Sequence, residues 1–153
     1  MNKRTWPRKR EGSTEPARED GARKQRGSVV TETNAPAEIY RRYLEEEKLG
    51  FQRCTDCSSA VFYPRVLCPF CGGAYLEWSE SSGHGTVYAT TAVHQRGAEP
   101  YNVALVDLEE GFRVMSRIEG LSAEEVEIGM KVTFATRAGD DGPVAVFEPE
   151  DVL

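Results

Sequence analysis

The sequence predicts a mainly β protein made of an N-terminal helix, a rubredoxin-like zinc ribbon and a five-stranded OB-fold barrel. Three observations support this prediction. The only four cysteines fall as two CxxC pairs, one amphipathic segment precedes them, and five short segments rich in β-branched residues follow them. The predicted domains are a tail over residues 1–33, the helix and ribbon over residues 34–78, and the barrel over residues 79–153.

The composition allows a packed core of modest size and excludes a membrane span. Of the 153 residues, 29% are charged and 39% are hydrophobic, and no run approaches the ~20 apolar residues that cross a bilayer. Cysteines that are kept free to bind a metal favour a reducing compartment, so the predicted location is the cytoplasm. The net charge of −6 is uneven, because residues 1–33 carry nine Lys/Arg against five Asp/Glu, whereas residues 79–153 carry five against fourteen.

The first 33 residues are predicted to be a disordered basic tail. Their few apolar side chains, Trp6, Val29 and Val30, cannot bury enough surface to offset the entropy of the chain. Basic clusters at residues 6–10 and 23–26 could bind a polyanion. We favour the simpler interpretation, a solvated tail or a misassigned start codon.

A short amphipathic helix is predicted to begin at Asn34 or Ala35, with Pro36 in its first turn and Gly50 as its stop. A helix of this length is not stable alone, so its apolar stripe must pack on this chain's own ribbon or on another protein. The aromatic pair within the stripe favours another protein. The predicted partner interface is therefore Ile39, Tyr40, Tyr43 and Leu44.

The cysteine spacing predicts a structural zinc site. The two CxxC pairs are separated by ten residues, and each pair can fold as a tight knuckle whose thiolates converge on one metal. Gly72 suits the turn after the second pair, whereas Ser58 takes the matching place after the first. Four protein ligands leave no open coordination position, so the metal is structural. The predicted ligands are Cys54, Cys57, Cys68 and Cys71.

Three other interpretations of the cysteines compete with structural zinc. Two disulfides are disfavoured because the chain has no signal peptide and CxxC spacing is unusual for a secreted protein. A dithiol redox motif requires a helix N-terminus in a βαβ setting, which the sequence does not show. Iron in a rubredoxin-like site would use the same four ligands, and the spacing does not distinguish it from zinc.

The remaining segments are predicted to be strands. Residues 60–65 and 75–78 complete the ribbon, and the barrel strands cover residues 86–93, 103–108, 112–118, 131–137 and 144–147. Five short strands with a longer excursion before the fourth are typical of an OB-type barrel.

No catalytic residue is predicted. His84 and His94 bracket the first barrel strand, and neither has a base or nucleophile nearby in the sequence. No Ser-His-Asp order, phosphate-binding glycine loop or paired-carboxylate motif stands out. An independent enzyme such as a dithiol reductase would also need cysteines that are free of metal.

Taken in order, these motifs resemble a known family over about residues 36–150. The motifs that carry the resemblance are Cys54-x-x-Cys57, Tyr63-Pro64-Arg65, Cys68-Pro69-x-Cys71-Gly72, Trp78, residues 82–88, Pro100-Tyr101, residues 104–108, Gly111 and residues 128–132. They resemble the zinc-ribbon/OB-fold proteins first catalogued as a domain of unknown function, number thirty-five, and now associated with acyl-CoA metabolism. Ser58 departs from the family's usual glycine.

The resemblance implies a non-catalytic accessory subunit in a hetero-oligomer with a thiolase-superfamily enzyme. That enzyme would be a thiolase, an acyltransferase or a sterol side-chain aldolase, with acyl-CoA at the shared interface. Arg53 and Arg65 flank the ribbon and could contact a CoA phosphate, because a guanidinium binds phosphate with two parallel hydrogen bonds. The alternative is that both are ordinary surface arginines.

Nucleic-acid binding is the alternative function, because zinc ribbons and OB folds are both used in this way. Such a site needs a basic groove with exposed aromatic side chains. The predicted barrel instead carries a net charge of −9, which repels a phosphate backbone over most of its surface. Only the tail is basic, so nucleic acid is not an expected partner.

Overall fold

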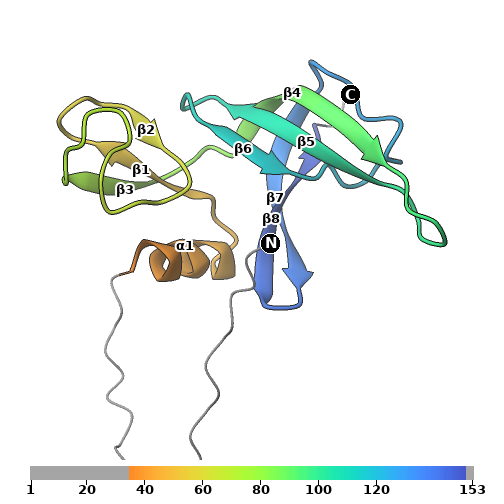
Figure 1. Cartoon of the computed structure of the whole chain (residues 1–153), viewed down its shortest axis with the longest axis horizontal. Coiled ribbons are helices and arrows are strands. Elements are labelled where there is room, and N and C mark those ends of the chain that lie inside the picture. The colour runs from red at the N-terminus through yellow and green to blue at the C-terminus, as the bar shows by residue number, and fades with distance from the viewer. Residues whose placement is uncertain (1–34, 151–153) are drawn as a thin grey trace, which may run out of the picture. The chain divides into compact units, whose positions relative to one another are not determined.

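The computed structural model describes residues 35–150, and the predicted basic tail lies outside the described residues. Within this part of the chain, one helix is followed by eight strands (Figure 1). The elements are α1 (Pro36–Glu45), β1 (Gly50–Cys54), β2 (Ala60–Val61), β3 (Leu76–Glu80), β4 (His84–Val93), β5 (Tyr101–Leu108), β6 (Arg113–Ser116), β7 (Lys131–Gly139) and β8 (Gly142–Pro149). The helix found within residues 35–150 is not long and apolar enough to cross a membrane.

Helix α1 ends earlier than the sequence predicted. Pro36 occupies its first turn and Ala35 is the N-cap, without a side-chain hydrogen bond. At the other end, Glu47 has a φ of 58°, and the N–H of Lys48 donates to the Tyr43 carbonyl at 2.9 Å. This left-handed turn closes the helix before the residue that was expected to stop it.

Gly50, expected to end the helix, instead begins β1 and makes room for an aromatic ring. A Cβ atom at this position would lie 2.6 Å from Cγ of Tyr43. That ring in turn stacks on Trp78, with the two centroids 5.5 Å apart. Only a residue without a side chain allows α1 to approach β1 this closely.

The ribbon is a three-stranded antiparallel sheet in the order β2-β1-β3. Strand β1 lies in the centre, with Gln52 paired to Val61 on one side and to Trp78 on the other. The predicted strand over residues 60–65 is reduced to Ala60–Val61, because the chain then leaves the sheet to form the loop that carries the second cysteine pair.

The five remaining strands form a nearly closed antiparallel barrel in the order β6-β5-β4-β7-β8, which confirms the predicted OB-type fold. The predicted third barrel strand over residues 112–118 is interrupted. Beyond β6, the Arg117 carbonyl accepts a bond from the N–H of Phe147 at 2.9 Å, and the N–H of Glu119 donates to the Phe147 carbonyl at 2.8 Å. These bonds join the first and last strands of the sheet and leave little free edge.

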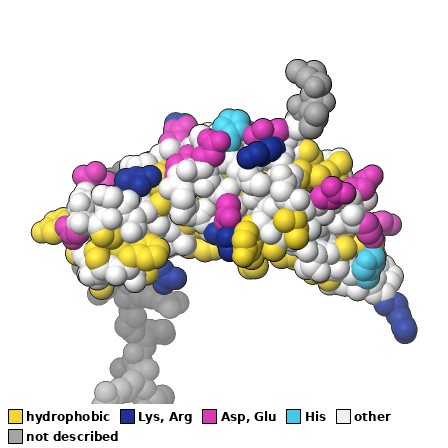
Figure 2. All heavy atoms as spheres, turned by 90° about the horizontal axis from the view of Figure 1, so that it is seen from above, with side chains coloured by type: hydrophobic (Ala, Val, Ile, Leu, Met, Phe, Trp, Pro, Cys, Tyr) yellow, Lys and Arg dark blue, Asp and Glu magenta, His cyan; other side chains and the backbone are white. Residues whose placement is uncertain are grey.

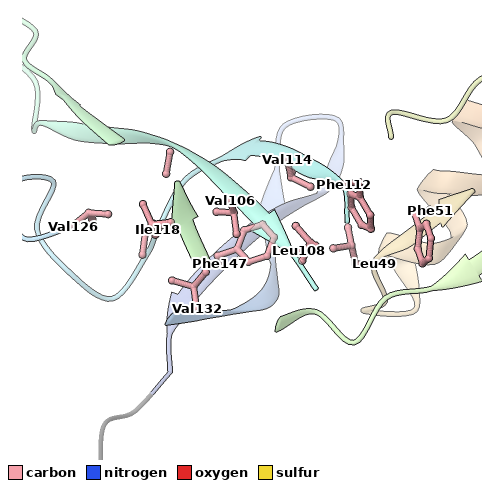
Figure 3. Close-up of a cluster of buried hydrophobic side chains, with 12 residues drawn as sticks. Leu49, Phe51, Val106, Leu108, Phe112, Val114, Ile118, Val126, Val132 and Phe147 are labelled. Atoms are coloured by element: carbon pink, nitrogen blue, oxygen red, sulfur yellow. The ribbon is translucent and has the colours of Figure 1, made fainter. Parts of the chain in front are cut away.

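The buried core extends from the barrel into the ribbon. Alternate residues of β5 point inward, and they pack with side chains from β4, β6, β7 and β8. Leu49 and Phe51 belong to the same cluster, and the ring of Phe51 stacks on that of Phe112 at 4.9 Å (Figure 3). Phe62 also stacks on Phe112, at 5.2 Å. Ribbon and barrel therefore share one hydrophobic cluster.

Candidate metal centre

The four cysteines converge at one end of the ribbon. Cys54 closes β1, Cys57 follows in the next turn, and Cys68 and Cys71 lie in the loop between β2 and β3. Their four sulfur atoms lie within 4.8 Å of one another, and two of the sulfur pairs, Cys54–Cys71 and Cys57–Cys68, are 3.6 Å apart. A tetrahedral zinc with Zn–S of about 2.3 Å requires sulfurs about 3.8 Å apart, so this donor set fits the ion.

The two knuckles are built alike. In the first, the N–H of Ser58 donates to the Cys54 carbonyl at 2.9 Å, and in the second, the N–H of Gly72 donates to the Cys68 carbonyl at the same distance. The residue after each pair adopts a left-handed backbone, with φ of 61° for Ser58 and 77° for Gly72. The first knuckle thus places a serine where the fold favours glycine.

One half of the site is buried and the other faces solvent. Cys54 and Cys68 are 1% and 2% exposed and pack with Val61 and Leu76, whereas Cys57 and Cys71 are exposed. All four are free cysteines.

The two arginines proposed for CoA differ in their surroundings. The Nη1 atom of Arg53 donates to the Ser58 carbonyl at 3.0 Å, and its guanidinium lies 5.3 Å from the centroid of the Phe51 ring. This residue therefore braces the first knuckle from the side. Arg65 is exposed, and only its backbone N–H is bonded, to Oε1 of the buried Gln52 at 2.7 Å. A contact of either residue with a CoA phosphate stays a prediction.

Much of the helical stripe packs inside this chain. Leu44 is only 6% exposed, and Tyr40 contacts the rings of Phe62 and Tyr63 edge-on, at 5.6 and 6.2 Å. Burial, followed by the charge of Tyr63, raises the pKa of Tyr40. Helix α1 therefore packs on this chain, against β1 of the ribbon and β8 of the barrel.

The outer part of the stripe borders a hollow. Ile39 and Tyr43 line it together with Lys48 and Glu80, and its volume is about 430 Å³. A role of Ile39, Tyr40, Tyr43 and Leu44 in binding another protein stays a prediction.

Sequence reasoning missed a group of exposed apolar side chains on the ribbon. Between β2 and the end of the second knuckle, the loop over residues 63–70 exposes Tyr63, Val66, Leu67 and Phe70, and we call it the apolar loop. In Figure 2 hydrophobic side chains gather at the left-hand end, where Figure 1 places the ribbon. The signal in the sequence was an apolar run with neither strand nor helix periodicity next to a metal ligand.

Both histidines are paired with glutamates. Nδ1 of His84 lies 2.8 Å from Oε1 of Glu150, and Nε2 of His94 lies 3.5 Å from Oε1 of Glu124. The hydrogen bond that the His84 ring donates to Glu150 is the main cause that raises the pKa of His84. Both pairs are exposed on the surface of the barrel, and each is an ion pair only when its histidine is protonated.

Two family models match consecutive parts of the chain. Residues 41–77 match the rubredoxin-like zinc ribbon domain of ChsH2, and residues 78–137 match the C-terminal OB-fold domain of ChsH2. The zinc ribbon match and the four converging cysteines together agree with a structural zinc ion.

The chain covers most of the length of some relatives and only part of the length of others. A DUF35 domain-containing scaffold protein of Methanocaldococcus jannaschii is 35% identical over 115 residues, which cover 69% of this chain and 82% of the relative. A "Probable enoyl-CoA hydratase alpha subunit" of Thermomonospora curvata is 33% identical over 110 residues, and the chain spans only 34% of its length. Among solved structures, the chain is similar to one titled Ltp2-ChsH2(DUF35) aldolase, with a TM-score of 0.65, 29% identity, and coverage of 81% of this chain and 98% of that one.

Proposed function

Because this chain belongs to the DUF35 family of zinc-ribbon and OB-fold scaffold proteins, we propose that it is a non-catalytic accessory subunit of an acyl-CoA enzyme. The partner is a thiolase-superfamily enzyme, namely a thiolase, an acyltransferase or a sterol side-chain aldolase. The two form a hetero-oligomer with acyl-CoA at the shared interface. Similarity to an aldolase that carries a DUF35 component, and to a protein named as a hydratase subunit, supports the general class of partner.

In this proposal Cys54, Cys57, Cys68 and Cys71 hold zinc as a structural ion. Four thiolates complete a tetrahedral shell, so the bound ion supplies folding energy and leaves no position for a substrate. The division into a helix-plus-ribbon domain over residues 34–78 and a barrel over residues 79–153 is part of the same proposal. The free metal-binding cysteines agree with a location in the cytoplasm.

The observation that carries the proposal is the exposed apolar surface of the ribbon. Phe70 is 68% exposed and Val66 is 72% exposed, although both lie next to a rigid metal knuckle. With Tyr63 and Leu67, the apolar loop exposes on the order of 400 Å² of side chain, which is as large as the largest patch on a typical monomer. A stable interface buries about 800 Å² on each partner, so this loop would supply about half of one.

We assign the rest of the proposed partner interface to helix α1, which lies next to the apolar loop. Tyr63 of the apolar loop contacts Tyr40, which connects the loop to the stripe of α1. Ile39 and Tyr43 line the hollow next to the stripe, whereas Leu44 is buried under the helix. Arg65 extends the same loop with an exposed cation, so it suits a CoA phosphate better than Arg53, whose guanidinium already binds a carbonyl.

Purification from the protein's own host tests this proposal. The tagged full chain is expected to carry zinc and to co-purify in near-equal amount with one enzyme that mass spectrometry identifies as thiolase-like and that acts on acyl-CoA. Phe70→Ser is expected to reduce recovery of that enzyme at least tenfold. Ile128→Ser is the matched control, because Ile128 is 70% exposed but lies between β6 and β7 of the barrel.

Two outcomes would overturn the proposal. Recovery of nucleic acid in place of an enzyme would favour the alternative of a nucleic-acid-binding module. A zinc-loaded protein that recovers no acyl-CoA enzyme would also contradict it. Equal losses for the Phe70 and Ile128 variants would keep the accessory role but remove the apolar loop from the interface.

A further inference from the structure

A hydrogen-bonding group from the residue two places further on lies beside the sulfur of each solvent-facing cysteine. At the second knuckle this group is the backbone N–H of Gly73, which donates to Sγ of Cys71 at 3.4 Å. At the first knuckle it is the hydroxyl of Ser59, whose Oγ lies 3.3 Å from Sγ of Cys57 and accepts from that sulfur while the sulfur carries a proton. The first knuckle therefore has a hydroxyl group that the second, with glycine in the same place, does not have.

We infer that the hydroxyl of Ser59 donates to the metal-bound Cys57 thiolate and helps to retain the metal. A thiolate that binds zinc has no proton, so it can only accept, and the hydroxyl must be the donor. A hydrogen bond to a charged acceptor is stronger than one between neutral groups. This inference concerns the zinc site of the proposed function and rests on its four ligands.

The position of this bond explains why it matters. Four thiolates around one divalent ion leave a charge of about −2. Burial beside Val61 and Leu76 keeps water from Cys54 and Cys68, whereas Cys57 and Cys71 face water and any competing chelator. A donor on an exposed thiolate offsets part of its charge and hinders its protonation and dissociation from the metal.

The backbone around Ser59 holds the hydroxyl in place. Its carbonyl accepts a hydrogen bond from the N–H of Cys54 at 3.0 Å, and the preceding Ser58 carbonyl accepts one from Arg53 at 3.0 Å. The two residues that follow, Ala60 and Val61, are paired in β2. Ser59 is thus a positioning residue whose hydroxyl is held beside the sulfur by these backbone bonds.

Metal release from the full chain tests this inference. Loaded with zinc and mixed with a coloured chelator, Ser59→Ala is expected to release the metal roughly tenfold faster than the wild type, the lower end of the range for lost outer-shell partners. Loaded with cobalt(II), the same variant is expected to shift the sulfur-to-cobalt charge-transfer band to lower energy, because a thiolate without a donor is easier to oxidise. Ser59→Thr keeps a hydroxyl and is expected to restore both values.

Thr55→Val is the matched control. Thr55 lies in the same knuckle, but its hydroxyl donates to the Tyr75 carbonyl at 3.3 Å and not to a sulfur. This variant is expected to leave the cobalt band unchanged. An unshifted band and unchanged release for Ser59→Ala would overturn the inference, as would an equal shift for Thr55→Val. A wild-type chain that binds neither metal would instead contradict the proposed zinc site itself.

Discussion

Replacement of Ser58 by glycine is expected to stabilise the zinc-loaded protein. Ser58 has a φ of 61°, in the left-handed region, and Gly72 has a φ of 77° at the matching place in the second knuckle. A residue with a Cβ pays about 1–2 kcal/mol to adopt this conformation, and glycine avoids that cost. Glycine also loses more backbone entropy on folding, by about 0.5–1 kcal/mol, so the net gain for Ser58→Gly is about 0.5–1 kcal/mol.

The reverse substitution in the second knuckle, Gly72→Ser, is expected to lower the free energy of unfolding. A Cβ added at Gly72 would meet no atom within 4 Å, so Gly72→Ser carries the backbone cost without a steric clash. The expected decrease in the free energy of unfolding is about 0.5–1 kcal/mol. The N–H groups of both residues keep their bonds to the Cys54 and Cys68 carbonyls, so the metal geometry is unchanged in either variant.

Two measurements report this difference. Denaturant unfolding of the zinc-loaded variants gives the change in free energy directly from the shift in midpoint at constant slope. Because metal binding and folding are coupled, a gain of about 0.7 kcal/mol is also expected to tighten zinc binding about threefold. A destabilised Ser58→Gly variant, or a Gly72→Ser variant as stable as the wild type, would refute the argument from backbone conformation.

Three further predictions concern the ligands, the helix contact and the barrel surface. Cys68→Ser is expected to lose zinc and ribbon structure together, as measured by metal analysis and near-ultraviolet circular dichroism, because Cys68 is a buried ligand candidate. Gly50→Ala is expected to lower the free energy of unfolding by about 1–3 kcal/mol, since the new methyl would overlap the Tyr43 ring. Glu150→Gln is expected to lower the pKa of His84 towards its ordinary value in an NMR titration, because the hydrogen bond that His84 donates to the Glu150 carboxylate raises this pKa. That raised pKa adds stability below the pKa of unfolded histidine, and this stability is lost as the pH rises through the folded value.

Each of these predictions has a result that contradicts it. A Cys68→Ser protein with full zinc content would show that the four cysteines are not a single site. A neutral Gly50→Ala variant would mean that the helix can move away from β1 at no cost. An unchanged titration of His84 would mean that its pair with Glu150 is not formed in solution.

Local pattern was enough to predict the order of the three parts and the cysteine cluster. Two CxxC pairs can converge on one metal only through two tight turns, so their spacing constrains the local structure closely. The barrel strands alternate between buried and exposed residues, as β5 illustrates, so a period of two identified them. The interrupted third strand was missed because residues 117–119 bond to β8, a partner about 30 residues away in the sequence.

The surroundings of the site depended on tertiary packing and were not predictable from local pattern. Gly50 has the same sequence context whether it stops a helix or receives the ring of Tyr43, and only the approach of α1 to β1 decides between them. Likewise, Tyr40 is an exposed aromatic on an isolated helix, but the rings of Phe62 and Tyr63 cover it in the folded chain. Tyr40, which the sequence assigned to a partner interface, thus packs partly within the chain. The exposed apolar surface lies instead on the apolar loop.

Because ribbon and barrel share one hydrophobic cluster, metal binding in the ribbon also affects the stability of the barrel. Phe51 lies on β1, three residues before Cys54, and Phe62 follows β2, so loss of the knuckles would free both rings that stack on Phe112. Truncation of a buried Phe to Ala costs about 3–5 kcal/mol, a large share of the stability of a small domain. The zinc ion therefore does more than shape the apolar loop that would meet the enzyme. It also supports the barrel through the stacked rings of Phe51, Phe62 and Phe112, so in the proposed complex loss of the metal would alter both the apolar loop and the stability of the barrel.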